Sequence, residues 1–230
     1  MHRSGPDGAP WVVLVHGIGV SSRYFRPLTR ALETTHRVLS LDLPGFGAST
    51  HPRRPLTLAE HGEVVAAVMA EHGVSGATLL GHSLGGQVVV ELLRAHPGAA
   101  ARAVLLGPTT DDRARSAVRQ GLRLLRDSFG EPLSFVALEV RAYLACGPRV
   151  YLHTLGHMLA HRTEEALPHV AVPVLVARGA RDPVAPRAWV ERLAATSPLA
   201  TTAEASGGGH GVHYTHAEEL ARIISAFEAA

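Results

Sequence analysis

The stretch Gly81-His82-Ser83-Leu84-Gly85 decides the fold, because it sets a serine between a strand and a helix. The apolar run before it, residues 77–80, is typical of a buried strand, and residues 84–95 read as a buried helix. Such a sharp turn strains the serine backbone and tolerates only small neighbours, which accounts for Gly81 and Gly85. It also exposes the hydroxyl at a helix N-terminus, where backbone N–H groups can meet negative charge. The pattern predicts a nucleophilic serine; the alternative is a glycine-rich turn with an incidental serine.

Strand-like and helix-like segments alternate along the rest of the chain. A capping-box pair, Thr57 and Glu60, opens one of the predicted helices. Strands alternating with helices predict an α/β fold, a mostly parallel sheet flanked by helices on both faces. The predicted strands are residues 11–15, 37–42, 77–80, 103–106, 174–177 and, more weakly, 201–205.

The alternation breaks between Pro108 and Pro168, where helical periodicity replaces strand signals. We therefore divide the chain into a core, residues 1–107 and 169–230, and an inserted helical lid, residues 108–168. Because ligands of open α/β sheets bind at the carboxyl ends of the strands, we expect the lid to cover Ser83. Its apolar faces favour a largely apolar substrate. These faces are Val118, Leu122 and Leu125, then Leu133, Val136, Val140 and Leu144, then Leu152, Leu155 and Leu159.

Composition narrows the range of partners. The 230 residues suit one domain, and the net charge of +2 is too small for a nucleic-acid-binding surface. All 22 basic residues are arginines, and those at 113–126 read as a solvated helix face. The single Cys146 allows no internal disulfide, and no apolar run is long enough to span a bilayer. We expect a cytoplasmic protein with a small-molecule substrate and without a nucleic-acid or membrane partner.

Five motifs, taken in order, resemble those of the α/β-hydrolase superfamily, and the resemblance covers nearly the whole chain. They are His16-Gly17, the Asp-Leu-Pro-Gly-Phe-Gly run at 42–47, Gly81–Gly86, Gly179-Ala180-Arg181-Asp182 and Gly209-His210. The order serine, aspartate, histidine matches the order of that family's catalytic triad.

The resemblance implies a role for each matching residue. Ser83 corresponds to the nucleophile, His210 to the general base, and Asp182 to the carboxylate that orients the imidazole. The backbone N–H groups of Ile18 and Leu84 correspond to the oxyanion hole. Other residues compete for two of these roles: His213 and His216 for the base, Asp111 and Asp112 for the acid.

Histidines on the third lid helix raise the question of a metal. His153, His157 and His161 recur four residues apart, a spacing that can bind zinc, and Glu164 and Glu165 lie one turn further. Nothing else completes such a site, so we expect neither a metal nor a cofactor. The candidates for lining the substrate pocket are His16, His82, His153, His157 and Val184.

Two departures from the family pattern bear on fold and function. Only fifteen residues precede His16, so the first hairpin is expected to be missing. The sheet would then have about six strands, with residues 37–42 as an edge through which a homodimer could form; otherwise we expect a monomer. Gly211 follows His210, where relatives that cleave carbon–carbon bonds carry a bulky aromatic residue.

Three functions remain open on the sequence. The leading hypothesis is a serine hydrolase that cleaves a small, largely apolar ester, thioester or lactone through an acyl-enzyme on Ser83. The second is a lyase, cyclase or carbon–carbon hydrolase that uses the same triad without a classical ester substrate. The third is a binding module without turnover, which the filled triad positions disfavour.

Overall fold

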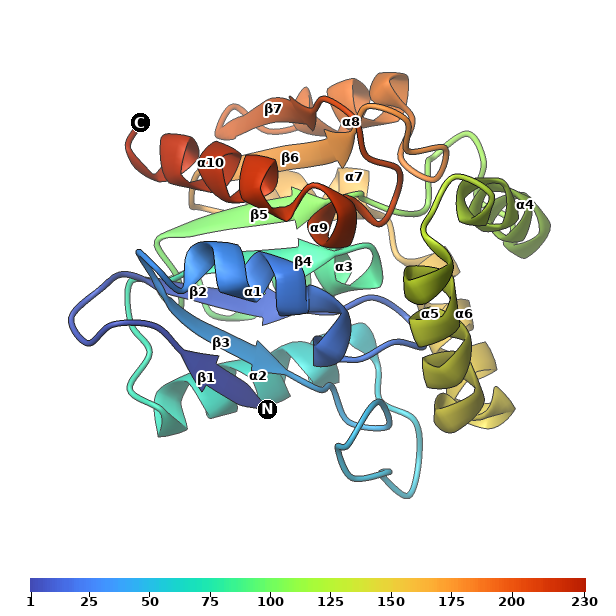
Figure 1. Cartoon of the computed structure of the whole chain (residues 1–230), viewed down its shortest axis with the longest axis horizontal. Helices are drawn as coiled ribbons and strands as arrows, with labels where there is room; N and C mark the ends of the chain where they lie inside the picture. The colour runs from blue at the N-terminus through green and yellow to red at the C-terminus, as the bar shows by residue number, and fades with distance from the viewer.

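The computed structural model describes all residues 1–230 and contains a seven-stranded, mostly parallel sheet with helices on both faces (Figure 1). The strand order is β1-β3-β2-β4-β5-β6-β7, and only β1 runs antiparallel to its neighbour. The strands are β1 His2–Ser4, β2 Trp11–Val15, β3 Arg37–Leu41, β4 Thr78–His82, β5 Arg102–Leu106, β6 Val174–Gly179 and β7 Ala200–Ala205. The α/β fold class predicted from the sequence is confirmed.

Alternate residues of the strands pack into two separate cores, one on each face of the sheet. In β2, Val13 and Val15 belong to one core, whereas Val12 and Leu14 belong to the other. A strand buried on both faces reads as an uninterrupted apolar run, which is how these strands appear in the sequence.

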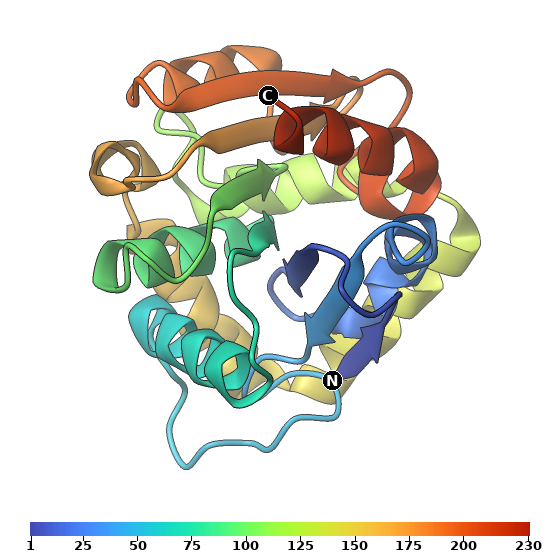
Figure 2. The same ribbon diagram turned by 90° about the vertical axis from the view of Figure 1, so that its left-hand side faces the viewer.

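Helices cover both cores. The first core lies under α2 Leu58–Glu71, α3 Leu84–Ala95 and α8 Arg187–Ala194. The second lies under α1 Arg26–Leu32, α9 Val212–Thr215 and α10 Ala217–Glu228, with the short helix η1 Ser22–Phe25 leading into α1. Figure 2 shows α2 and α3 on one side of the sheet and α1 and α10 on the other. No helix has the length and apolar character required to cross a bilayer.

The predicted capping box opens α2. Thr57 Oγ1 accepts a hydrogen bond from the Glu60 N–H at 3.2 Å, and Glu60 Oε2 accepts one from the Thr57 N–H at 2.8 Å. These two bonds satisfy N–H groups that have no acceptor inside the helix.

A helical insertion separates β5 from β6 and lies beyond the carboxyl ends of the parallel strands (Figure 1). It consists of α4 Ala117–Ser128, α5 Leu133–Cys146, α6 Pro148–Ala160, α7 Thr163–Ala166 and η2 Leu167–His169. The three expected helices are present, but their leucine-rich faces do not turn inward as we expected. Many of these side chains face solvent, among them Val118, Leu122, Leu125, Leu133, Val140, Leu144 and Leu152.

The sheet has seven strands where about six were expected, because residues His2–Ser4 form β1 and pair with β3. Three residues are too few for a periodic signal, so this strand could not be predicted from its sequence. Gly5, at φ 98°, turns the chain out of β1. Since β1 covers β3, residues 37–42 are not an edge, and the proposed reason for a homodimer there no longer applies. The true edge, β1, is short, which limits pairing with another chain.

Candidate active site

Ser83 stands in the turn between β4 and α3 with a strained backbone. Its φ is 56° and its ψ −121°, values that a residue other than glycine rarely adopts. A Cβ at Gly81 would lie 2.2 Å from the Gly85 carbonyl oxygen, and a Cβ at Gly85 would lie 2.1 Å from the Val15 carbonyl oxygen. Both positions therefore require glycine, as the motif predicts. The Ser83 N–H donates to the Leu106 carbonyl at 2.9 Å, which ties the turn to β5.

Asp182 and His210 come from the loops after the neighbouring strands β6 and β7. His210 Nδ1 lies 2.9 Å from Asp182 Oδ2, and both side chains are buried. The other oxygen, Asp182 Oδ1, accepts hydrogen bonds from the N–H groups of Val184 at 2.7 Å and Ala185 at 3.0 Å. The carboxylate is thus held from both sides and cannot rotate away from the imidazole.

The electrostatics of this pair follow from the contact. Burial alone would raise the pKa of Asp182, but the facing imidazole and the hydrogen bonds hold it below its usual value. Burial alone would lower the pKa of His210, but the Asp182 carboxylate outweighs it and raises that pKa above its usual value. The two groups therefore stabilise each other's charged forms.

Ser83 and His210 line one cavity of about 20 Å³, together with Ile18 and Leu124. No hydrogen bond joins the Ser83 hydroxyl to the imidazole; bonds between catalytic groups often tighten only when substrate binds. A second cavity of about 50 Å³ begins on another side of Ser83. Its lining is mostly apolar and includes Ile18, Leu124, Leu155, Met158 and Val184.

Two backbone N–H groups beside Ser83 are free to bind an anion. Ile18 follows the β2 strand and lines both cavities, and its N–H has no acceptor within the protein. Leu84 is the first residue of α3, where an N–H has no acceptor inside the helix. The preceding N–H, of Gly17, is already donated to the Tyr24 hydroxyl at 2.8 Å. These contacts leave Ile18 and Leu84 as the available donors.

The geometry agrees with comparisons to known proteins. The family model described as "Alpha/beta hydrolase family" matches residues 12–223. A pimeloyl-(acyl-carrier protein) methyl ester esterase of Xanthomonas oryzae pv. oryzae is 30% identical over 255 residues, covering 100% of this chain and 99% of that protein. The chain belongs to the α/β-hydrolase family. It is an enzyme of the α/β-hydrolase type.

Solved structures share the fold of this hydrolase. The enol-lactonase from Burkholderia xenovorans LB400 aligns with a TM-score of 0.83 at 22% identity, covering 100% of this chain and 95% of that one. A thermophilic esterase from Thermogutta terrifontis aligns with a TM-score of 0.84 at 20% identity, covering 99% and 92% of the two chains. At such identities the likeness describes the fold alone.

His82 joins the two halves of the hydrolase's candidate site. Its Nδ1 accepts from the Tyr24 hydroxyl at 2.8 Å, and its Nε2 donates to the His210 carbonyl at 3.0 Å. Since Tyr24 also accepts from Gly17, one chain of hydrogen bonds links the loop after β2 to the loop of His210. Burial keeps the pKa of His82 well below its usual value, so the ring is neutral. His82 lines the smaller cavity as expected.

The other expected pocket residues divide into two groups. Val184 lines the larger cavity beside Ser83. His16 lines neither cavity: it is buried behind its loop, accepts from the Leu43 N–H at 2.9 Å and bonds the Gly17 carbonyl at 2.8 Å. Its contacts hold the loop that carries Ile18.

His153 and His157 also line neither cavity, contrary to our expectation. They lie on the outer side of α6 with their Nε2 atoms 3.0 Å apart. His161 points elsewhere, to Glu91 at 3.0 Å and Thr163 at 3.0 Å. The repeat therefore does not converge on one point, because His161 follows the last residue of α6, where the backbone is extended, and bonds Glu91 of α3.

The competing bases are placed away from the Ser83 hydroxyl. His213 is fully buried without a hydrogen-bond partner, and its ring packs against those of Tyr24 and Phe135. His216 bonds Thr215 at 3.0 Å at the surface.

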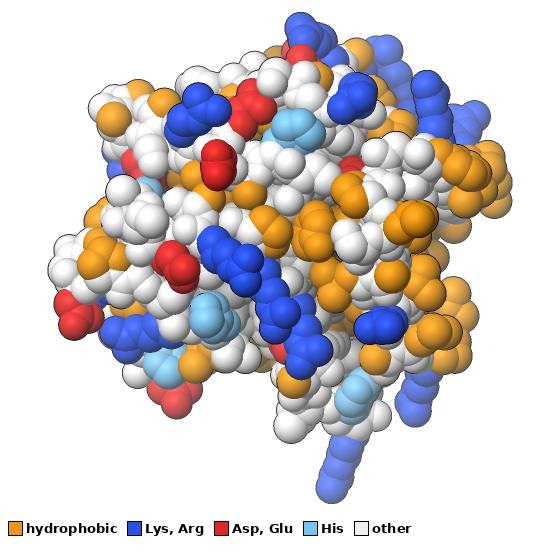
Figure 3. All heavy atoms as spheres, viewed as in Figure 1, with side chains coloured by type: hydrophobic (Ala, Val, Ile, Leu, Met, Phe, Trp, Pro, Cys, Tyr) orange, Lys and Arg blue, Asp and Glu red, His pale blue; other side chains and the backbone are white.

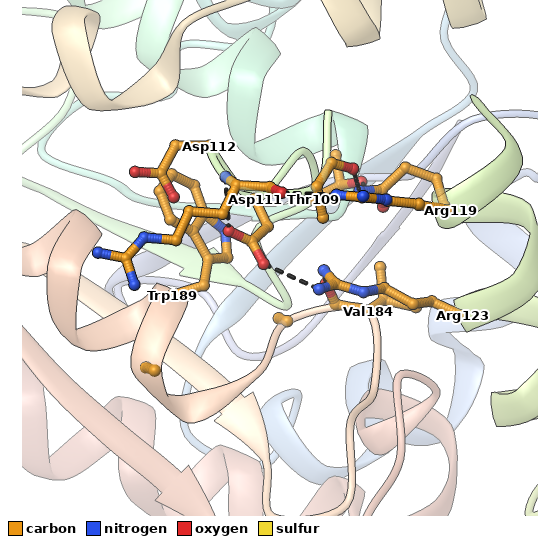
Figure 4. Close-up of polar contacts among 12 residues, drawn as sticks. Thr109, Asp111, Asp112, Arg119, Arg123, Val184 and Trp189 are labelled. Carbon is orange, nitrogen blue, oxygen red and sulfur yellow. Dashed lines mark hydrogen bonds and ion pairs between the residues drawn. The ribbon is translucent and has the colours of Figure 1, made fainter. Parts of the chain in front are cut away.

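The competing acids form ion pairs with arginines. Asp111 pairs with Arg123 at 2.9 Å (Figure 4). Arg192 pairs with Asp111 at 2.9 Å and with Asp112 at 2.6 Å. Neither acid bonds His210.

Three acids of the helical insertion were not predicted for the site. Asp127 Oδ1 accepts from the His210 N–H at 2.9 Å, and Glu131 Oε1 accepts from the Gly211 N–H at 3.0 Å, so both hold the histidine loop. Glu139 lines the smaller cavity with Ser83 and His210, and burial raises its pKa to about 7. No motif marks these residues, because they meet the core loops only after folding.

The absence of an aromatic residue after His210 has a steric reason. A Cβ at Gly211 would lie 2.5 Å from the ring of Phe135 on α5. That ring occupies the space in which a bulky side chain at position 211 would stand.

A larger cleft is separate from this site. It is open, has a volume of about 760 Å³ and lies on the other side of Asp182, between α4 and the loop after β6. Neither Ser83 nor His210 lines it, so we assign the reaction to the smaller cavities beside them.

Proposed function

We propose that this hydrolase cleaves a small, largely apolar ester, thioester or lactone through an acyl-enzyme on Ser83. One observation carries the proposal: Ser83 and His210 line the same cavity while His210 is bonded to Asp182 at 2.9 Å. The methyl ester esterase, which is 30% identical over the whole of this chain, supports an ester bond as the substrate class.

In the proposed reaction, His210 Nε2 takes the proton of the Ser83 hydroxyl as the oxygen attacks the substrate carbonyl carbon. Asp182 stabilises the imidazolium that forms. The N–H groups of Ile18 and Leu84 donate to the oxyanion, and each such donor lowers the barrier by about 3–4 kcal/mol. The imidazolium then protonates the leaving oxygen or sulfur, and the acyl group remains on the serine.

Hydrolysis of the acyl-enzyme repeats these steps with water. His210 removes a proton from a water molecule as the water oxygen attacks the carbonyl carbon of the acyl-enzyme ester. It then returns the proton to the Ser83 oxygen. The free acid leaves and the resting enzyme is restored.

The cavities support a small apolar acyl group. The larger of the two cavities lies on one side of the nucleophile and is lined by Ile18, Leu124, Leu155, Met158 and Val184. The volume of this cavity, about 50 Å³, favours short acyl chains. We also propose a cytoplasmic location, which the single buried thiol of Cys146 suits, since reducing compartments keep thiols free.

A fluorophosphonate probe tests the nucleophile. Mass spectrometry should find one adduct on the wild-type protein and none on Ser83→Ala, while Ser225→Ala, on the exposed side of α10, should label normally. A series of p-nitrophenyl esters then tests the substrate: kcat/KM should be highest for short chains. Absence of labelling would remove Ser83 as the nucleophile, and labelling without turnover of any ester would refute ester hydrolysis.

A further inference from the structure

Helix α4 packs against the rest of the protein with its apolar side facing solvent. Val118, Leu122, Leu125 and Phe129 recur at helical spacing and are 72%, 62%, 56% and 86% exposed. We call these four residues the apolar ridge. A surface helix of a globular protein normally turns such a stripe toward the core. The ridge thus leaves a large apolar area in water that nothing in the chain covers.

The polar side of α4 faces the protein and is bonded to it. Gln120 is 2% exposed and donates to the Ala114 carbonyl at 3.1 Å. Arg123 pairs with the buried Asp111 at 2.9 Å (Figure 4). Asp111 also pairs with Arg192 of α8. These contacts hold the helix in this orientation, because turning the ridge inward would break the ion pair and expose Gln120.

Positive charge borders the ridge. Arg119 and Arg126 are exposed on α4 beside it, and Arg141 and Arg149 are exposed on α5 and at the start of α6. The ion pairs made by arginines of this region involve Arg115, Arg123 and Arg162, which leaves these four without an acidic partner.

Acids do not balance this charge. Residues 117–149 contain three acids, Asp127, Glu131 and Glu139. The first two bond the histidine loop and the third lines the Ser83 cavity, so all three point inward. In Figure 3, hydrophobic side chains gather on the side of the molecule where α4 and α5 lie, with arginines among them.

We propose that α4 docks the hydrolase on an anionic lipid surface. The ridge would enter the boundary between headgroups and acyl chains, while Arg119 and Arg126 would meet lipid phosphates. An amphipathic helix with leucine and phenylalanine on one face and arginines beside them is typical of peripheral membrane attachment. The earlier expectation of no membrane partner considered only segments that span a bilayer.

Other occupants fit this surface less well. A second copy would bring its own arginines against Arg119 and Arg126, and like charges in contact repel. A protein partner that binds an amphipathic helix usually does so through a preformed apolar groove on its surface. A fluid lipid phase needs no such groove, because it can accommodate the exposed leucine and phenylalanine side chains of the ridge directly. The proposal does not depend on the chemistry of Ser83.

Vesicle flotation with the full chain tests the proposal. Vesicles of phosphatidylglycerol mixed with phosphatidylcholine should carry the protein, vesicles of phosphatidylcholine alone should carry much less, and added salt should weaken the binding. Phe129→Ser and Leu122→Ser should each reduce the partition coefficient about tenfold. Arg126→Gln should reduce it about fivefold at low salt.

Matched controls lie outside the helical insertion. Leu199→Ser replaces a 43% exposed leucine before β7, and Arg222→Gln replaces an exposed arginine on α10. Both should bind vesicles as the wild type does. Circular dichroism and turnover of a soluble ester should be unchanged in every variant, because none of these residues lines the Ser83 cavities.

Three results would overturn the proposal. The first is no binding to either kind of vesicle. The second is binding that the ridge and arginine variants leave unchanged, which would assign it to another surface. The third is a concentration-dependent dimer in sedimentation, or a complex with an acidic protein, that Phe129→Ser abolishes while vesicle binding persists.

Discussion

His210 Nδ1 lies 2.9 Å from Asp182 Oδ2, although 28 residues separate the two along the chain. The contact depends on the sheet: β6 and β7 are parallel neighbours, so the loops that follow them meet at the same edge. Ser83 reaches that edge from β4. The strand order therefore brings together three side chains that the sequence keeps far apart.

Asp182→Asn should reduce kcat about 10⁴-fold on a short p-nitrophenyl ester while leaving the fold intact. The amide cannot stabilise the imidazolium, and it favours the wrong tautomer of His210. Steady-state kinetics measure the effect, and Asp112→Asn is the matched control because Asp112 pairs only with Arg192. A loss below tenfold would mean that Asp182 does not act on the imidazole.

The value of kcat/KM should increase with pH in the range above pH 6.5. The free base of His210 accepts the serine proton, and the Asp182 carboxylate holds the pKa of His210 above its ordinary value of 6.5. The fraction of free base, and with it the rate, therefore increases only as the pH passes that raised pKa.

Titration of the ¹⁵N-labelled imidazole checks the assignment. In Asp182→Asn the pKa of His210 should fall, because burial then acts without the opposing carboxylate. The proposed pairing would be contradicted if kcat/KM of the wild type increased with a midpoint at or below pH 6.5. An unchanged pKa of the His210 imidazole in the variant would contradict it as well.

Glu139→Gln should stabilise the fold at alkaline pH. Burial raises the pKa of Glu139 from 4.5 to about 7, so between these values the folded state binds the proton more tightly than the unfolded state. Stability from this group is full below pH 4.5 and is lost as the pH rises through about 7. Urea unfolding at pH 8 and pH 4 should show the variant gaining on the wild type only at the higher pH. Glu191→Gln, at an exposed site on α8, should show no such difference.

Gly85→Ala should destabilise the protein by about 3 kcal/mol or more, or prevent folding. The new Cβ would lie 2.1 Å from the Val15 carbonyl oxygen, and both groups belong to rigid backbone in the sheet and α3. Gly98→Ala is the control, since a Cβ there meets nothing within 4 Å. Equal thermal stability of the two variants would show that the turn at Ser83 is looser than its contacts indicate.

Much of the core was predictable because its signals are local. The apolar runs of the buried strands, the Thr57–Glu60 capping box and the glycines around Ser83 each reflect contacts within a few residues or a backbone shape. The triad candidates followed from a resemblance in motif order, and folding brings Asp182 and His210 into contact.

Predictions failed where the answer depended on distant partners. β1 is three residues long and exists because β3 offers a pairing edge. His153 and His157 share one side of α6 as their spacing predicts, but spacing does not say whether that side meets the pocket. Glu139 carries no motif, and its place in the cavity follows from how α5 packs over the strand ends.

By itself, the sequence determined most of the strands and helices, where the nucleophile turn lies, and that α4 is amphipathic. Only the tertiary structure decided which side of α4 faces water. Periodicity is a property of one helix, whereas orientation depends on what the rest of the fold offers it. Here the buried Asp111 and the Ala114 carbonyl hold Arg123 and Gln120 against the core, and the leucines remain outside.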